Sequence, residues 1–181
     1  MESIYDLDIY NPIKNDLKIY QCSFVLAPEL WKKYSIDDLP DIDFKKWKRI
    51  KLMRDGNFSK ELSQIPTEYG GIYIYCIEPN IVPDIGIYVM YIGKATKTPN
   101  QNLRKRVQSY KRDLVDDETR PRIHRLLNLW GDSVYVYYLP INSNKEVITA
   151  LEDRLIAAYG KPPCNAEVRC KSVRLAVRAF E

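Results

Sequence analysis

Two segments rich in β-branched and aromatic residues stand close together in the middle of the chain. They read GGIYIYCI over residues 70–77 and GIYVMYIGK over residues 86–94, and this composition favours β-strands. The residues between them, 78–85, include two prolines, an asparagine and an aspartate, which are typical of a turn. The two segments therefore predict an antiparallel β-hairpin with a long loop, and so a β-sheet at the centre of the fold.

The rest of the chain adds helices and one more core strand. After the hairpin we expect helices over Leu103–Leu114, Arg120–Leu129 and Ser143–Tyr159, a strand over Ser133–Leu139, and a last helix within Glu167–Glu181. Before it, the sequence predicts a strand over Leu17–Leu26, a short helix over Pro28–Tyr34 and a helical turn over Asn57–Gln64.

This order predicts an α/β fold, with a small antiparallel sheet of three core strands flanked by helices. We expect three parts: an N-terminal α/β extension over residues 1–64, a core domain over 65–166 and a basic C-terminal segment over 167–181, read as a helix. The chain has 181 residues, of which 45% are hydrophobic and 29% are charged, a composition typical of a globular protein.

Several classes of protein are disfavoured by the sequence. The longest apolar runs, such as Ile85–Ile92, are too short to span a bilayer, and the first ten residues lack the pattern of a signal peptide. We therefore expect a cytoplasmic protein with no membrane partner. The four cysteines are too sparse for a disulfide scaffold.

Positive charge is concentrated in the second half of the chain. The formal net charge is +4, yet residues 94–125 alone hold 10 basic and 4 acidic residues. A basic region of this kind suggests a polyanionic partner. The alternative is a solvated helix face, which charge alone favours.

Two tripeptides, Gly71-Ile72-Tyr73 and Tyr91-Ile92-Gly93, occupy the two predicted hairpin strands. They are followed in order by Lys94, by the segment Asn102–Tyr110 with Arg106, by Glu152 within a predicted helix, and by Asn165 after two prolines. Over residues 65–165 this order resembles the GIY-YIG nuclease superfamily, in the lysine-bearing form of its UvrC-like branch. A second such tripeptide, Gly86-Ile87-Tyr88, lies too close to Tyr91 for a turn and is read as plain strand.

The chain departs from the family pattern in two ways. The stretch between Gly93 and Arg106 is longer than is common, through an insertion near residues 98–101. Where many members have a histidine one turn after the arginine, this chain has Tyr110, as in the UvrC-like branch. The single histidine, His124, lies elsewhere and reads as a surface or packing residue.

The resemblance implies hydrolysis of DNA phosphodiesters with Mg²⁺, or Mn²⁺ in its place, as cofactor. It implies a catalytic set made of Tyr73, Tyr91, Lys94, Arg106, Tyr110, Glu152 and Asn165. Glu152 would be the single metal ligand, because an unpaired carboxylate beside an apolar helix stripe is costly and a cation would offset that cost. Arg106 offers a planar fork for phosphate. Tyr73 would be the general base, which requires nearby cations, since a tyrosine pKa is ordinarily about 10.

Each of these residues also has a structural interpretation. Glu152 could pair with an arginine, Lys94 could protect an edge strand, Arg106 could be an ordinary exposed helix residue, and Asn165 could belong to a turn. Tyrosine is common in strands, so the structural interpretation is strong for any single one.

We expect double-stranded DNA as the partner and a homodimer or a larger assembly as the active form. The residues expected to contact nucleic acid are Lys94, Lys97, Arg104, Lys105, Arg106, Lys111, Arg112, Arg122 and Arg125. A restriction- or defence-type endonuclease, or the nuclease subunit of a DNA-processing assembly, fits best. The alternatives are a catalytically silent nucleic-acid-binding module on the same fold and a protein-interaction domain.

Overall fold

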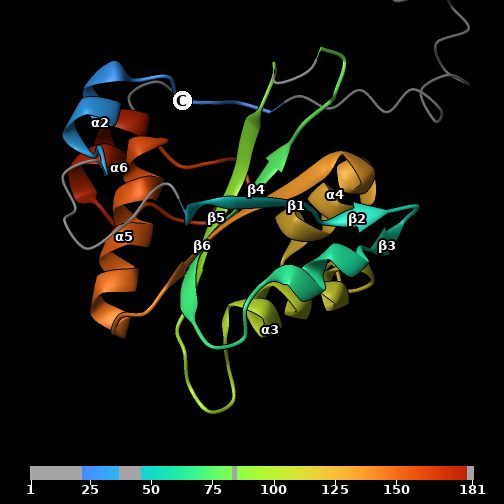
Figure 1. Ribbon diagram of the computed structural model, residues 1–181. Coiled ribbons are helices and arrows are strands. Elements are labelled where there is room, and N and C mark those ends of the chain that lie inside the picture. The colour runs from blue at the N-terminus through green and yellow to red at the C-terminus, as the bar shows by residue number, and fades with distance from the viewer. Residues whose placement is uncertain (1–21, 37–45, 83–84, 179–181) are drawn as a thin grey trace, which may run out of the picture.

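The fold is built on a four-stranded antiparallel sheet with helices on both faces. The computed structural model describes residues 22–36, 46–82 and 85–178. The sheet has the strand order β1-β6-β4-β5 (Figure 1). Its strands are β1 (Lys48–Lys51), β4 (Gly70–Ile77), β5 (Tyr88–Ala95) and β6 (Val134–Ile141). The α/β class and the long-loop hairpin of β4 and β5 are confirmed.

The prediction of three core strands was wrong, because the segment before residue 65 supplies a fourth. Strand β1 pairs with β6, and Ile50 lies opposite Val136. Of the four β1 residues only Ile50 is buried, and the other three are lysines and an arginine. A charged edge strand of this length lacks the alternation that marks a strand in sequence.

Part of the predicted N-terminal structure is also corrected. The strand expected over Leu17–Leu26 falls partly outside the described residues, and residues 22–27 form no regular element. The short helix is present as α2 (Pro28–Lys33), with its proline in the first turn. The predicted helical turn is a 3₁₀ helix over Lys60–Gln64, preceded by the small hairpin of β2 (Met53–Arg54) and β3 (Asn57–Phe58).

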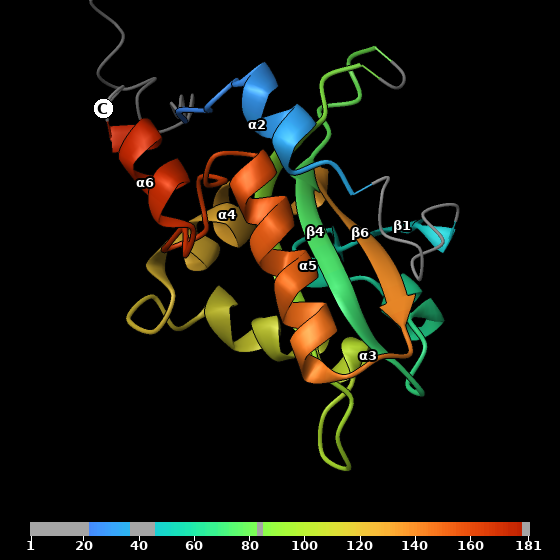
Figure 2. The same ribbon diagram turned by 90° about the vertical axis from the view of Figure 1, so that its left-hand side faces the viewer.

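The helices divide between the two faces of the sheet, as Figure 1 shows with the sheet seen edge-on. One face carries α2, α5 (Lys145–Ala158) and α6 (Lys171–Arg178); the other carries α3 (Leu103–Gln108) and α4 (Pro121–Trp130). In Figure 2 α5 runs across the sheet close to β4. A 3₁₀ helix over Ser109–Leu114 continues α3, and another over Gly131–Ser133 follows α4. Among the described helices, none has the length and apolar character needed to cross a bilayer.

Alternation along β4 and β5 produces two separate cores. Ile72, Ile74 and Ile92 pack with the apolar stripe of α5. Tyr73 and Tyr75 point to the opposite face and pack with α3, α4 and the 3₁₀ helix between them. Successive side chains of a strand point to opposite faces. The hairpin therefore contributes tyrosines to one core and isoleucines to the other.

Candidate functional site

Four tyrosines and an arginine meet on the face covered by α3 and α4. The hydroxyl oxygens of Tyr73 and Tyr110 are 2.7 Å apart, and the Tyr110 hydroxyl donates to that of Tyr91 at 3.1 Å. Arg106 Nε donates to the Tyr73 hydroxyl at 3.3 Å. The Tyr75 ring packs against the other three at centroid distances of 5.3 to 5.7 Å.

These hydrogen bonds have a single consistent direction. A hydroxyl carries one proton, so if Tyr110 donates to Tyr91, Tyr73 must donate to Tyr110. The chain therefore runs from Arg106 through Tyr73 and Tyr110 to Tyr91. Tyr91 is only partly buried and keeps its own proton, which it can donate to an external acceptor such as a phosphate oxygen.

Burial sets the ionisation of this cluster. The side chains of Tyr73, Tyr75 and Tyr110 are fully buried. Burial raises the pKa of Tyr73 well above its ordinary value, the neighbouring phenols of Tyr110 and Tyr91 add to that rise, and Arg106 opposes it only in part. In this arrangement burial therefore favours the protonated phenol of Tyr73, which makes it a poor general base at neutral pH.

The glycines of the two tripeptides are required by packing. A Cβ atom on Gly93 would lie 2.5 Å from the Tyr73 hydroxyl oxygen. Gly71 has a φ of +144°, and its Cβ would collide with the Leu139 carbonyl oxygen. The missing side chain of Gly93 therefore makes room for the Tyr73 ring.

Of the two arginines of α3 that the sequence singles out, only Arg106 faces the tyrosines. Arg104 donates through Nε to the Ile65 carbonyl and through Nη2 to the Ser63 carbonyl, both at 2.6 Å. It fastens α3 to the segment that leads into β4. The two side chains therefore have different tasks, as their positions two residues apart on a helix require.

Lys94 and Glu152 meet on the opposite face of the sheet. Lys94 Nζ is 2.9 Å from Glu152 Oε2, and it donates to Thr149 Oγ1 at 2.9 Å. The Lys94 and Glu152 side chains are 20% and 13% exposed. Lys94 supplies a compensating charge for Glu152, so the burial of this carboxylate does not by itself require a metal cation. Thr149 donates its own proton to the Lys145 carbonyl, so its lone pairs face Lys94.

A divalent ion would have one protein carboxylate at this place. Among the described residues there is no group of three or more His, Cys, Asp or Glu side chains able to hold a metal. Mg²⁺ often keeps several waters and uses one or two carboxylates with substrate phosphate. The partly exposed Glu152 fits such an ion when phosphate supplies further ligands, and the ammonium of Lys94 competes with it.

Asn165 locks the outer edge of β5. Its Oδ1 accepts from the Ile92 backbone N–H at 2.9 Å, and its Nδ2 donates to the Ile92 carbonyl at 2.8 Å. The Cys164 N–H donates to the Met90 carbonyl at 2.8 Å. The segment after the two prolines therefore continues the hydrogen bonding of the sheet. Asn165 holds Ile92, the residue between Tyr91 and Gly93, which is the position that an anchoring role requires.

The second tripeptide lies away from the cluster. Tyr88 pairs with Ile77 at the far end of the hairpin, is 46% exposed, and packs on Phe24 with ring centroids 5.8 Å apart. Gly86 and Ile87 precede the strand.

Most of the basic residues expected to contact nucleic acid lie on α3, α4 and the 3₁₀ helix between them, whereas Lys94 faces α5. Several also make contacts within the protein: Lys97 with the Thr67 carbonyl, Lys105 with the Asn100 carbonyl, Lys111 with the Phe58 ring, and Arg122 with the Asn165 carbonyl. Arg112 and Arg125 are exposed. His124 Nδ1 lies 2.9 Å from the Asp113 carbonyl oxygen, so this side chain contacts the protein backbone.

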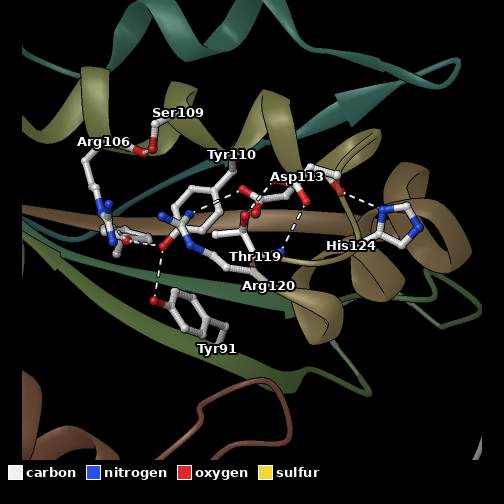
Figure 3. Close-up of polar contacts among 10 residues, drawn as sticks. Tyr91, Arg106, Ser109, Tyr110, Asp113, Thr119, Arg120 and His124 are labelled. Atoms are coloured by element: carbon white, nitrogen blue, oxygen red, sulfur yellow. Dashed lines mark hydrogen bonds and ion pairs between the residues drawn. The ribbon is translucent and has the colours of Figure 1, made fainter.

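Three residues next to the candidate site were missed from sequence, namely Arg120, Asp113 and Thr149. Arg120 lies over the Tyr110 ring with its guanidinium carbon 4.7 Å from the centroid, and its Nη1 is 3.3 Å from Asp113 Oδ2 (Figure 3). Thr149 holds Lys94. Thr149 and Glu152 lie three residues apart on one helix, and this spacing could have indicated that Thr149 is close to Glu152. The Arg120 contact joins two helices, so no local pattern marks it.

Comparison with protein-family models, with curated proteins and with solved structures returned no match.

Proposed function

We propose that the chain is a Mg²⁺-dependent endonuclease of the GIY-YIG type that hydrolyses DNA phosphodiesters. The observation that carries the proposal is the hydrogen-bonded chain Arg106–Tyr73–Tyr110–Tyr91 beside Gly93. It joins, in three dimensions, residues that the motif resemblance selects from three separate segments. Two further parts complete the set. Lys94, which follows Gly93 in β5, pairs with Glu152, and Asn165 binds the edge of the same strand.

In this proposal the chain's residues bind and orient the scissile phosphate. Arg106, partly buried at the edge of the cluster, neutralises charge on a phosphate oxygen. The Tyr91 hydroxyl donates a hydrogen bond to the same phosphate. Tyr73 keeps its proton and positions Arg106 and Tyr110, so we assign it a positioning role in place of the general base. A divalent ion at Glu152 would supply a bound water of lowered pKa.

The second candidate is a nucleic-acid-binding module without catalysis. Two observations favour it: Lys94 already compensates the Glu152 charge, and Tyr73 is fully buried. Under this reading the basic face would bind the nucleic-acid backbone while the cluster stabilises the fold.

Conversion of supercoiled plasmid to nicked or linear DNA separates these readings. We expect conversion by the wild-type protein with Mg²⁺ and none with EDTA. Glu152→Gln should abolish conversion while DNA binding and thermal unfolding stay close to wild type. The matched control is Asp153→Asn on the same helix, whose carboxylate pairs with Arg169 at the surface. Binding without conversion by the wild-type protein would support the second candidate, and an active Glu152→Gln would remove Glu152 from the metal site.

A further inference from the structure

Arg120 stands at the start of α4 and reaches back to the tyrosine cluster. Its guanidinium contacts two groups of the preceding 3₁₀ helix, the ring of Tyr110 and the carboxylate of Asp113 (Figure 3). Asp113 is buried, with a side chain only 5% exposed. Burial raises the pKa of this carboxyl, and Arg120 opposes the rise. The ion pair with Arg120 therefore stabilises the charge of the buried Asp113 carboxylate, and Asp113 holds the arginine in place.

Tyr110 is shared by two arginines from different helices. The Arg106 guanidinium carbon is 5.5 Å from the ring centroid and that of Arg120 is 4.7 Å from it. The Tyr110 hydroxyl is the middle of the chain that ends at Tyr91. Two guanidinium groups and one carboxylate therefore lie around the buried Tyr110 ring, and the net charge beside it is positive, which attracts an anion to the accessible parts of the two arginines.

Arg120 can bind an outside group without leaving Asp113. A guanidinium has five N–H donors in a planar fork, and the contact with Asp113 uses Nη1. The Arg120 side chain is 27% exposed, about five times the fraction of its carboxylate partner. An arginine with one side on a buried carboxylate and the other accessible is suited to a phosphate oxygen.

We propose that Arg120 is a second phosphate-binding arginine of this site, which takes a backbone phosphate of the nucleic acid beside the one held by Arg106. Asp113 is its positioning residue. The inference rests on the proposed function, since it assigns the same site a second contact to the same class of ligand.

The test uses variants that separate phosphate binding from folding. Arg120→Gln alone leaves Asp113 as a buried, unpaired carboxylate, so the double variant Arg120→Gln/Asp113→Asn removes both charges. Asp113→Asn alone keeps the arginine. Arg54→Gln matches the charge change of Arg120→Gln and is the control for losing an arginine away from the site, because Arg54 is exposed and pairs with Glu61 on the β2 side. Thermal unfolding of each variant reports the fold.

The readout is the affinity for a labelled DNA duplex in EDTA at several salt concentrations, measured by fluorescence anisotropy. We expect the double variant to bind about tenfold more weakly, with a salt dependence shallower by about 0.9 in log–log slope, the amount for one phosphate contact. Asp113→Asn and Arg54→Gln should keep the wild-type slope.

Two results would overturn the assignment of Arg120: a double variant that matches Arg54→Gln in slope and affinity, or a binding defect of Arg120→Gln that disappears when Asp113→Asn is added. Single-turnover cleavage with Mg²⁺ distinguishes the two proposals. A wild-type protein that binds but does not cleave contradicts the nuclease proposal and leaves the Arg120 test intact. A wild-type protein that does not bind DNA contradicts both.

Discussion

Consecutive residues of β5 serve two very different environments. Tyr91 and Gly93 face a layer of buried, uncharged phenols, in which hydrogen bonds pass from one hydroxyl to the next. Lys94 faces the α5 layer, where it forms a partly exposed ion pair with Glu152. Gly93 packs against the Tyr73 ring and Lys94 is held by an ion pair, although the two residues are neighbours in the strand.

This difference indicates where a reaction could take place. A fully buried phenol with a raised pKa is suited to hold neighbours in position, whereas an ion pair near solvent can exchange partners when an anion or a cation arrives. β5 is the outermost strand of the described sheet, and residues 164–165 bond its edge at Met90 and Ile92. Beyond Ile92, groups from both faces can approach one ligand. We propose that the two layers form a single site at this edge.

The largest effect in the phenol layer is expected for Arg106→Lys. Lysine keeps the charge but loses the fork that meets Tyr73 and a phosphate together. We expect single-turnover cleavage to fall by about 10²–10³, with only a small loss of DNA affinity. Arg104→Lys is the control: it should lower stability through lost bonds to the Ser63 and Ile65 carbonyls and leave the rate of the folded protein near wild type. The reverse pattern would move the catalytic role to Arg104.

A smaller effect is expected for Tyr73→Phe, and its matched partner is Tyr75→Phe. Both tyrosines are fully buried on the same face of β4. Tyr73 bonds Tyr110 and Arg106, while the buried Tyr75 hydroxyl has no hydrogen-bond partner among the described residues. Tyr73→Phe should lower cleavage by about 10- to 10²-fold and the free energy of unfolding by about 1 kcal/mol.

Tyr75→Phe should leave cleavage unchanged and the free energy of unfolding equal to wild type or higher by about 1 kcal/mol, because it removes an unsatisfied polar group. Tyr88→Phe, outside the cluster, should be silent in both assays. If Tyr75→Phe or Tyr88→Phe loses more activity than Tyr73→Phe, the proposed chain of hydrogen bonds does not carry the function.

The smallest effect concerns stability at high pH. Burial raises the pKa of Tyr75 in the folded protein, so the folded state keeps a proton that the unfolded state loses above about pH 10. The contribution of this group is constant below that pH, and stability falls as the pH rises beyond it. Denaturant unfolding between pH 8 and 11 should show a decline that is shallower in Tyr75→Phe, by at most about 1.4 kcal/mol per pH unit. Equal declines would contradict full burial of this phenol.

Strongly patterned elements were predictable from the sequence. Strand β4 matches its predicted range of 70–77, and α5 begins after Asn144, whose side chain accepts from the Val147 N–H as an N-cap should. Strand β1 was missed because three of its four residues are charged. Its strand character comes from pairing with β6 and not from local preference.

The candidate site was predictable as a set of residues but not as an arrangement. The motif order selects Tyr73, Tyr91 and Arg106, and the structure brings these side chains together. That Lys94 would pair with Glu152 across 58 positions of sequence, or that Tyr73 would fill the space above Gly93, depends on tertiary packing. Such contacts leave no periodic or local signal in a single chain.

The most direct test of a single site is a double-mutant cycle across the strand, with Lys94→Met from one face and Arg106→Lys from the other. The measurement is the single-turnover rate of DNA cleavage with Mg²⁺ for the wild type, both single variants and the double variant. Residues that act as a unit are strongly non-additive. We therefore predict that the double variant is at least about tenfold faster than the product of the single effects requires, a coupling of about 1.4 kcal/mol. Additivity of the two effects within about 0.5 kcal/mol would show that the two faces act independently and would contradict a single site.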